Sequence, residues 1–153
     1  MSARIVARQL VLEELITVLT KEHEQLRKRL AEIHDVLARG DYSNSAQLVS
    51  EFDNSTLQHI VDEENVLLKL FVDAYGREGA DDAIRVFQQH RTMHKLADAI
   101  SKTALNSPEK LGSMPTDFDK LVRSHFEAEE NRIFPWALKT HQTVRNKQSK
   151  TST

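Results

Sequence analysis

Apolar residues recur every three or four positions through most of the chain, which is the spacing that places side chains on one face of an α-helix. Glycine and proline interrupt this pattern at a few places, and the breaks divide it into four segments. No segment alternates apolar and polar residues with the period of a β-strand. The pattern therefore predicts four helices: one ending near residue 39, one at about 45–75, one at about 81–106, and one from about Thr116 to Trp136. The part before Leu10 is either a separate short helix or a lead-in to the first helix.

Short connections between successive helices favour antiparallel neighbours, so we predict an all-α, up-down-up-down four-helix bundle. Pro135 falls inside the fourth helix, where it removes a backbone hydrogen bond and predicts a kink or an end. The last residues are polar and basic without periodicity, which is typical of disorder. The predicted organisation is one bundle domain, residues 1–142, followed by a disordered tail, residues 143–153.

Histidine and glutamate interrupt the apolar face of the second and fourth helices in the same way. The motif His-x-x-x-Glu-Glu-Asn occurs at 59–65 and again at 125–131, an offset of 66 residues. Residues four apart on a helix share a face, with Cβ atoms roughly 5–6 Å apart. Each copy therefore directs an imidazole and a carboxylate to the same place, and both groups bind first-row metals. The duplicated motif predicts a central site for two metal ions.

The other two helices repeat as well, because His23 aligns with His90 at an offset of 67 residues. The repeat fails one helical turn later, where the second half has His94 and the first half has Arg27. Arginine offers only hydrogen-bond donors and cannot bind a metal, so the sequence predicts two unequal halves. The candidate metal ligands are His23, His59, Glu63, His90, His94, His125 and Glu129.

A single His-x-x-x-Glu pair on a helix is most often a surface ion pair. Here the motif shares its face with leucine, phenylalanine, valine and isoleucine, so the pairs are expected to point inward. A buried carboxylate without compensation costs several kcal/mol, and two divalent cations would supply that compensation. Glu64 and Glu130 lie about 100° around the helix from the candidate carboxylates, so we expect them to flank the site rather than bind metal.

Composition excludes several other classes of protein. The net charge is −2 and the sequence has no basic face, so no nucleic-acid partner is expected. No apolar stretch approaches the length of a membrane span, and the N-terminus does not read as a secretory signal. There is no cysteine, which excludes disulfides and thiolate ligands and fits a cytoplasmic location. The oligomeric state cannot be predicted.

From about Leu10 to Trp136, this order of histidine and glutamate motifs resembles the hemerythrin-like (HHE cation-binding) family. The resemblance implies a non-haem di-iron centre with Glu63 and Glu129 bridging the two irons, usually together with an oxo or hydroxo group. It assigns the terminal ligands as His90, His94 and His125 on one iron, and His23 and His59 on the other.

The second bridging position departs from the oxygen-carrying hemerythrins. Their last carboxylate is an aspartate five residues after its histidine, a position that Glu130 occupies here. Glu129 stands four residues after His125, and its equivalence to Glu63 favours it as the bridge.

Three functions are compatible with such a site. The first is binding of O₂ or another small diatomic ligand, for sensing, storage or carriage, at the iron with fewer ligands. The second is a di-iron redox enzyme acting on NO or peroxide, or an iron donor in the repair of iron centres. The third is a structural role in which metal only stabilises the bundle. The unequal halves favour the first, since a vacant position distinguishes reactive metal sites from structural ones.

Overall fold

The computed structural model describes residues 4–151, which form helices and connecting segments and contain no strand. The seven α-helices are α1 (Leu12–Ala38), α2 (Tyr42–Ser55), α3 (Leu57–Asp62), α4 (Lys69–Gly79), α5 (Asp81–Asn106), α6 (Met114–Ala128) and α7 (Phe134–Thr151). Two π-helical segments, η1 (Glu63–Leu68) and η3 (Glu129–Ile133), and a 3-10 turn, η2 (Pro108–Lys110), complete the order. None of the helices in this part of the chain is long and apolar enough to cross a membrane.

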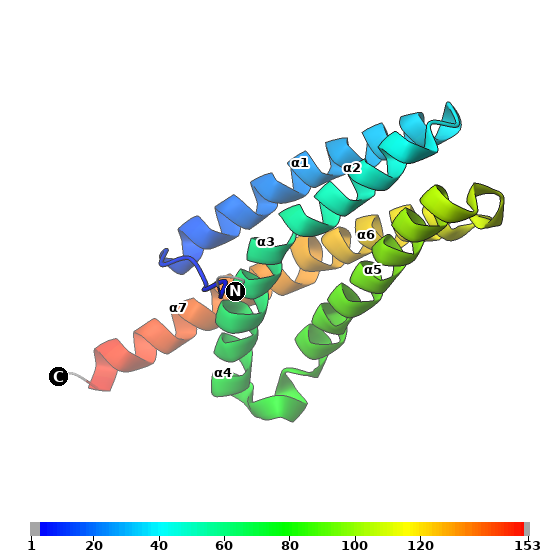
Figure 1. Ribbon diagram of the computed structural model, residues 1–153. Helices are drawn as coiled ribbons and strands as arrows, with labels where there is room; N and C mark the ends of the chain where they lie inside the picture. The colour runs from blue at the N-terminus through cyan, green and yellow to red at the C-terminus, as the bar shows by residue number, and fades with distance from the viewer. Residues whose placement is uncertain (1–3, 152–153) are drawn as a thin grey trace.

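These elements join end to end into four antiparallel rods (Figure 1). The first rod is α1 and the third is α5, while the second joins α2, α3, η1 and α4, and the fourth joins α6, η3 and α7. Helix α2 packs against both α1 and α5, and α6 packs against α5 and α1. The predicted all-α four-helix bundle is confirmed.

Two glycines allow the first and second reversals of the chain. Gly40 follows α1 with a φ angle of 74°, and Gly76 near the end of the second rod has a φ of 73°. Positive φ angles are accessible to glycine without the steric cost that a Cβ atom imposes. The backbone at both glycines therefore turns where the sequence predicted breaks between helices.

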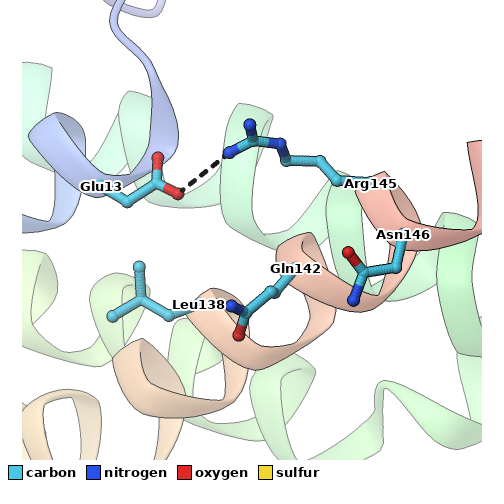
Figure 2. Close-up of a pocket in the computed structure, with 5 residues that line it drawn as sticks. All are labelled: Glu13, Leu138, Gln142, Arg145 and Asn146. Atoms are coloured by element: carbon cyan, nitrogen blue, oxygen red, sulfur yellow. Dashed lines mark ion pairs between the residues drawn. The ribbon is translucent and has the colours of Figure 1, made fainter. Parts of the chain in front are cut away.

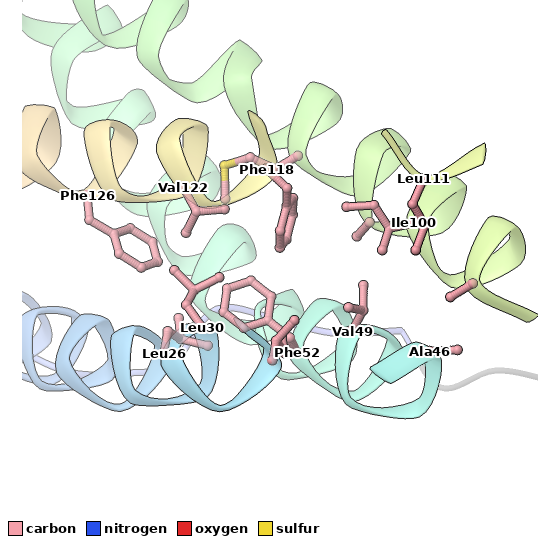
Figure 3. Packing of buried hydrophobic residues seen from close by; sticks show 14 residues of the cluster. Leu26, Leu30, Ala46, Val49, Phe52, Ile100, Leu111, Phe118, Val122 and Phe126 are labelled. Carbon is pink, nitrogen blue, oxygen red and sulfur yellow. The ribbon is translucent and has the colours of Figure 1, made fainter. Parts of the chain in front are cut away.

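The interior contains two apolar clusters with a polar layer between them. One cluster includes Leu30, Phe52 and Phe118, whose side chains meet between the rods (Figure 3). The other includes Leu15 and Phe71 and lies toward the start of α1. Along α1 the buried residues pass from the second cluster through His23 to the first cluster, so the polar layer crosses the middle of the bundle.

The π-helical segment η1 shifts the buried face of the second rod by one residue. Continued helical spacing after Glu63 predicts Val66 and Leu70 as the inner residues, but Leu67 and Phe71 are fully buried instead. A π-turn contains one more residue than an α-turn, and so it rotates every following side chain relative to the preceding ones. The sequence-based assignment of these two inner positions is wrong for that reason.

The fourth rod passes through Pro135 without ending. Pro135 is the second residue of α7, directly after η3, and residues near the start of a helical segment do not require an N–H donor. Helix α7 continues to Thr151, so residues 143–151 are helical where composition indicated disorder. Residues 1–3 and 152–153, which belong to the predicted domain and tail, lie outside the described residues.

A contact with the start of α1 accompanies this extension of α7. Figure 2 shows Arg145 of α7 facing Glu13 of α1 across a polar hollow of about 520 Å³, and the two charged groups are 3.7 Å apart. Leu138, Gln142 and Asn146 line the same hollow. It contains none of the candidate metal ligands.

Candidate metal centre

Six of the seven candidate ligands meet in the polar layer. Their donor atoms form two groups of four that share both carboxylates, and within each group the atoms lie within 4.8 Å of one another. All six side chains are buried, and Glu63 and Glu129 have no exposed surface. We refer to these residues as the His–Glu cluster: His23, His59, Glu63, His90, His125 and Glu129.

Glu63 presents one oxygen to each half of the cluster. Its Oε2 lies 3.4 Å from Nε2 of His59, and its Oε1 lies 3.0 Å from Nε2 of His90. The first histidine is on the same rod, whereas the second comes from α5. The carboxylate therefore connects the two groups of donors.

Glu129 occupies the equivalent position on the opposite side. Its Oε1 lies 3.2 Å from Nε2 of His125 and 3.1 Å from Nε2 of His23. The Nε2 atoms of His23 and His59 are 3.0 Å apart. Each half thus consists of two imidazoles from different helices together with both carboxylates.

The chemistry of this layer fits metal ions better than it fits a protein core. Among the described residues, both oxygens of Glu63, both oxygens of Glu129 and Nε2 of His90 and His125 are buried without a hydrogen-bond partner. Buried polar atoms are normally paired, and buried carboxylates more so, because desolvation is costly. These atoms all point into the layer, where cations would satisfy them together.

The Nδ1 atoms of the same imidazoles point outward to a second set of residues. Nδ1 of His59 lies 3.0 Å from Oε1 of Glu22, and Nδ1 of His125 lies 2.8 Å from Oε1 of Gln89. Each of these partners directly precedes a cluster histidine in the sequence. Such contacts fix the ring orientation and leave Nε2 free to bind metal.

The glutamates that follow Glu63 and Glu129 serve the remaining two imidazoles. Oε1 of Glu64 lies 3.4 Å from Nδ1 of His90, and Oε1 of Glu130 lies 3.5 Å from Nδ1 of His23. The duplication in the sequence therefore extends to the residues around the cluster. As expected, Glu64 and Glu130 flank the site and do not enter it.

Two residues near Glu22, Arg8 and Asp62, have no signal in the sequence pattern that links them to the site. The guanidinium of Arg8 donates to Glu22 at 2.8 Å and to Asp62 at 2.6 Å, and the backbone N–H of Arg8 also donates to Asp62. Asp62 is fully buried although it precedes Glu63 directly. Arg8 lies before α1 in a segment without helical spacing, so no sequence pattern places it near the site.

The structure does not bring His94 to the cluster. Its side chain is 62% exposed and Nδ1 lies 2.6 Å from Asp53 on α2. The buried face of α5 passes from His90 to Met93 and Ala97, three and then four residues on, which leaves His94 to one side. The inclusion of His94 in the ligand set is corrected on this geometry, and the two halves are left with two imidazoles each.

Arg27, the counterpart of His94, pairs with a carboxylate as its chemistry requires. Its two terminal nitrogens donate to the two oxygens of Glu130, at 3.0 and 2.5 Å, and its guanidinium carbon lies 5.6 Å from the centre of the Phe126 ring. Such bidentate pairs are strong and directional. This ion pair holds Glu130 outside the cluster.

The carboxylates favour the protonated form of two imidazoles when no metal is present. Burial disfavours the charged form of His59, but Glu63 and Glu22 outweigh it and raise the pKa of His59 to about 9. Burial also opposes protonation of His90, yet Glu63 and Glu64 raise the pKa of that imidazole as well. Metal ions would have to displace these protons, since an imidazole binds metal in its neutral form.

The other two imidazoles remain neutral in the metal-free chain. Burial, together with the nearby charge of His59, lowers the pKa of His23 to about 4. Burial and the charge of His90 lower the pKa of His125 to about 3. Each half therefore contains one imidazole whose pKa is raised by the carboxylates and one whose pKa is lowered by burial.

Comparison with known proteins agrees with this geometry. The family model of the hemerythrin HHE cation-binding domain matches residues 14–137, which include all six cluster residues. The chain belongs to this family of cation-binding domains, and the buried His–Glu cluster is its candidate metal centre. Neither the curated proteins nor the solved structures contain a significant match to the chain.

Proposed function

We propose that the His–Glu cluster holds two iron ions and binds O₂ or another small diatomic molecule. The observation that supports this most directly is the sharing of Glu63 and Glu129 between two groups of imidazoles. A carboxylate that faces two donor groups is suited to bridge two cations. Iron is proposed because the chain is a hemerythrin-family member with nitrogen and oxygen donors and no thiolate.

The protein donors leave room for an external ligand. His23 and His59 would serve one ion and His90 and His125 the other, with Glu63 and Glu129 shared. Two imidazoles with carboxylate oxygens resemble the donor sets of non-haem iron sites that keep open positions for O₂. Iron in such a site supplies electrons and an open position for a small oxidant.

The residues around the cluster would limit the access of water to such a ligand and hold the imidazoles in position. Phe126 stacks on His23 with ring centroids 4.0 Å apart, and Phe134 also stacks on His23 at 5.5 Å. These rings exclude water from one side of the cluster. The outer contacts of the four imidazoles orient their Nε2 atoms inward and limit their movement, which favours a preorganised site.

A di-iron redox enzyme acting on NO or peroxide, or an iron donor for damaged iron centres, is the second candidate. In the structure each half of the cluster has two imidazoles. This equality favours a redox enzyme more than the unequal halves expected from the sequence did. Because His94 lies outside the cluster, neither half has a third imidazole. Both ions would then have positions that no protein donor fills.

Exposure of the reduced protein to O₂ separates these functions. The chain is loaded anaerobically with ferrous iron, O₂ is admitted, and the solution is then purged. A charge-transfer absorption band that appears with O₂ and disappears on purging supports reversible binding. Irreversible conversion to ferric iron, or turnover of added peroxide or NO, supports the redox enzyme. Absence of any spectral response would contradict both.

A further inference from the structure

A surface hollow of about 340 Å³ lies beside the His–Glu cluster, between η1 and the first half of α5. Two of its lining residues contact His90. Glu64 lies 3.4 Å from Nδ1 of that imidazole, and the ring of Phe87 stacks on it with centroids 5.5 Å apart. One layer of side chains therefore separates the hollow from the buried donor atoms.

Glu64 differs in charge compensation from the other carboxylates that touch cluster imidazoles. Glu22 pairs with Arg8, and Glu130 pairs with Arg27. Arg91 also lines the hollow, but among residues 4–151 no lysine or arginine lies within ion-pair distance of Glu64. Its side chain is also the most exposed of the three, at 45% against 27% for Glu22 and 23% for Glu130. Glu64 is therefore a solvent-facing negative charge in direct contact with the cluster.

Aromatic rings also cover the His90 half of the cluster less than the His23 half. His23 is fully buried between Phe126 and Phe134. The 66-residue offset aligns Phe134 with Leu68, and Leu68 lines the hollow beside Glu64. A smaller side chain thus stands on the His90 side where a phenyl ring covers the His23 side. Two phenyl rings stack on His23 and one, Phe87, stacks on His90, while both arginines belong to the surroundings of His23 and His59.

We propose that divalent cations enter the cluster through the hollow at Glu64, so that the half formed by His90 and His125 takes up and releases metal first. A negative charge in a cleft raises the local concentration of cations and their association rate. The approach to His23 is closed by the Arg27–Glu130 pair and by stacked rings. This inference rests on the proposed two-metal function, and it reverses the expectation that the His23 half is the accessible one.

Uptake of cobalt(II) by the metal-free, full-length protein tests the route, because the ion absorbs visible light when bound and its binding can be followed by stopped flow. Glu64→Gln should slow uptake about ten-fold while both ions still bind at equilibrium. Leu68→Phe should slow uptake as well, by filling the hollow without altering charge. Glu109→Gln removes the charge of an exposed carboxylate in η2 that neither lines the hollow nor contacts the cluster, and this control should bind cobalt at the parent rate.

Salt dependence gives a second measure of the role of Glu64. Uptake by the parent should slow as ionic strength rises, and this dependence should weaken in Glu64→Gln, because screening acts on exposed charges. Thermal melts verify that each variant is folded. If Glu64→Gln fails to fold, Leu68→Phe decides the question alone.

Two results would overturn the route. One is parent-like uptake in both Glu64→Gln and Leu68→Phe, and the other is equal slowing in Glu64→Gln and Glu109→Gln. Failure of the parent to hold two cobalt ions at equilibrium would instead contradict the proposed function. Binding of two ions with unchanged rates in the variants would leave the function standing and remove only the entry route.

Discussion

Arg27 of α1 and Glu130 of η3, 103 residues apart in the chain, form a bidentate ion pair at the edge of the metal site. The pair accounts for the position of Glu130 outside the His–Glu cluster. Glu129, about 100° around the helix, lies in the interior with no exposed surface. Helical phase and this ion pair therefore place the two adjacent glutamates differently.

The first prediction concerns these two glutamates. Glu129→Ala should lose the bound metal, because it removes a carboxylate that both halves share. Glu130→Gln should retain two ions with affinity reduced roughly 10- to 100-fold, as expected for a residue that only orients a ligand. Elemental analysis after gel filtration measures both. Loss of metal from Glu130→Gln with retention in Glu129→Ala would reverse the assignment.

The second prediction concerns His94, which the sequence places in the ligand set and the structure places on the surface. His94→Ala should retain both ions and change the free energy of unfolding by no more than about 0.5 kcal/mol, because it removes only an exposed pair with Asp53. His90→Ala, one turn earlier on the same helix, should lose metal and serves as the matched comparison. Equal metal loss in the two variants would return His94 to the site.

The sequence could predict much of this molecule because its signals are periodic. Helical spacing locates the four rods, and the repeated motif locates His59, Glu63, His125 and Glu129. It could not predict the π-turns, because nothing in the residues of η1 or η3 distinguishes a π-turn from an α-turn before the fold exists. Yet each π-turn begins at a cluster carboxylate, Glu63 in η1 and Glu129 in η3.

The position of His94 shows that an i, i+4 spacing alone does not identify a metal ligand. Four residues of helix rotate a side chain about 40° beyond a full turn, so an i+4 partner is aligned only approximately. The buried face of α5 follows Met93 instead, and Asp53 provides His94 with a partner at the surface. Contacts between distant segments, such as Arg8 with Asp62, leave no periodic signal in the sequence at all.

The third prediction concerns the stability of the metal-free protein as pH changes. The pKa of His59 is raised in the fold from 6.5 to about 9, so its stabilising contribution is complete below 6.5 and is lost as the pH rises through 9. The pKa of His23 is lowered from 6.5 to about 4, so its contribution is present above 6.5 and is lost as the pH falls toward 4. The metal-free protein should therefore be most stable near neutral pH.

Denaturant titrations of chelated protein across this range measure the effect. Stability should fall between pH 6.5 and 9, the interval that separates the unfolded and folded pKa values of His59. The metal-loaded protein should lack this alkaline decline, because its imidazoles are already neutral and bound. A rise in metal-free stability over the same interval would contradict the proton positions inferred for the cluster.

The fourth prediction tests the central claim, that the His–Glu cluster binds two metal ions and that this binding is coupled to folding. Protein loaded anaerobically with ferrous iron and freed of excess metal should contain two ions per chain. Its melting temperature should fall clearly on chelation, because binding to the folded chain alone stabilises it. Double replacement of Glu63 and Glu129 by alanine should abolish both the bound metal and the shift.

The ratio of iron to protein in the loaded sample is the most direct of these measurements. Two ions per chain, lost together with thermal stability on chelation, is the result that the shared carboxylates predict. One ion or none, with a melting temperature that chelation leaves unchanged, would contradict a buried two-metal site.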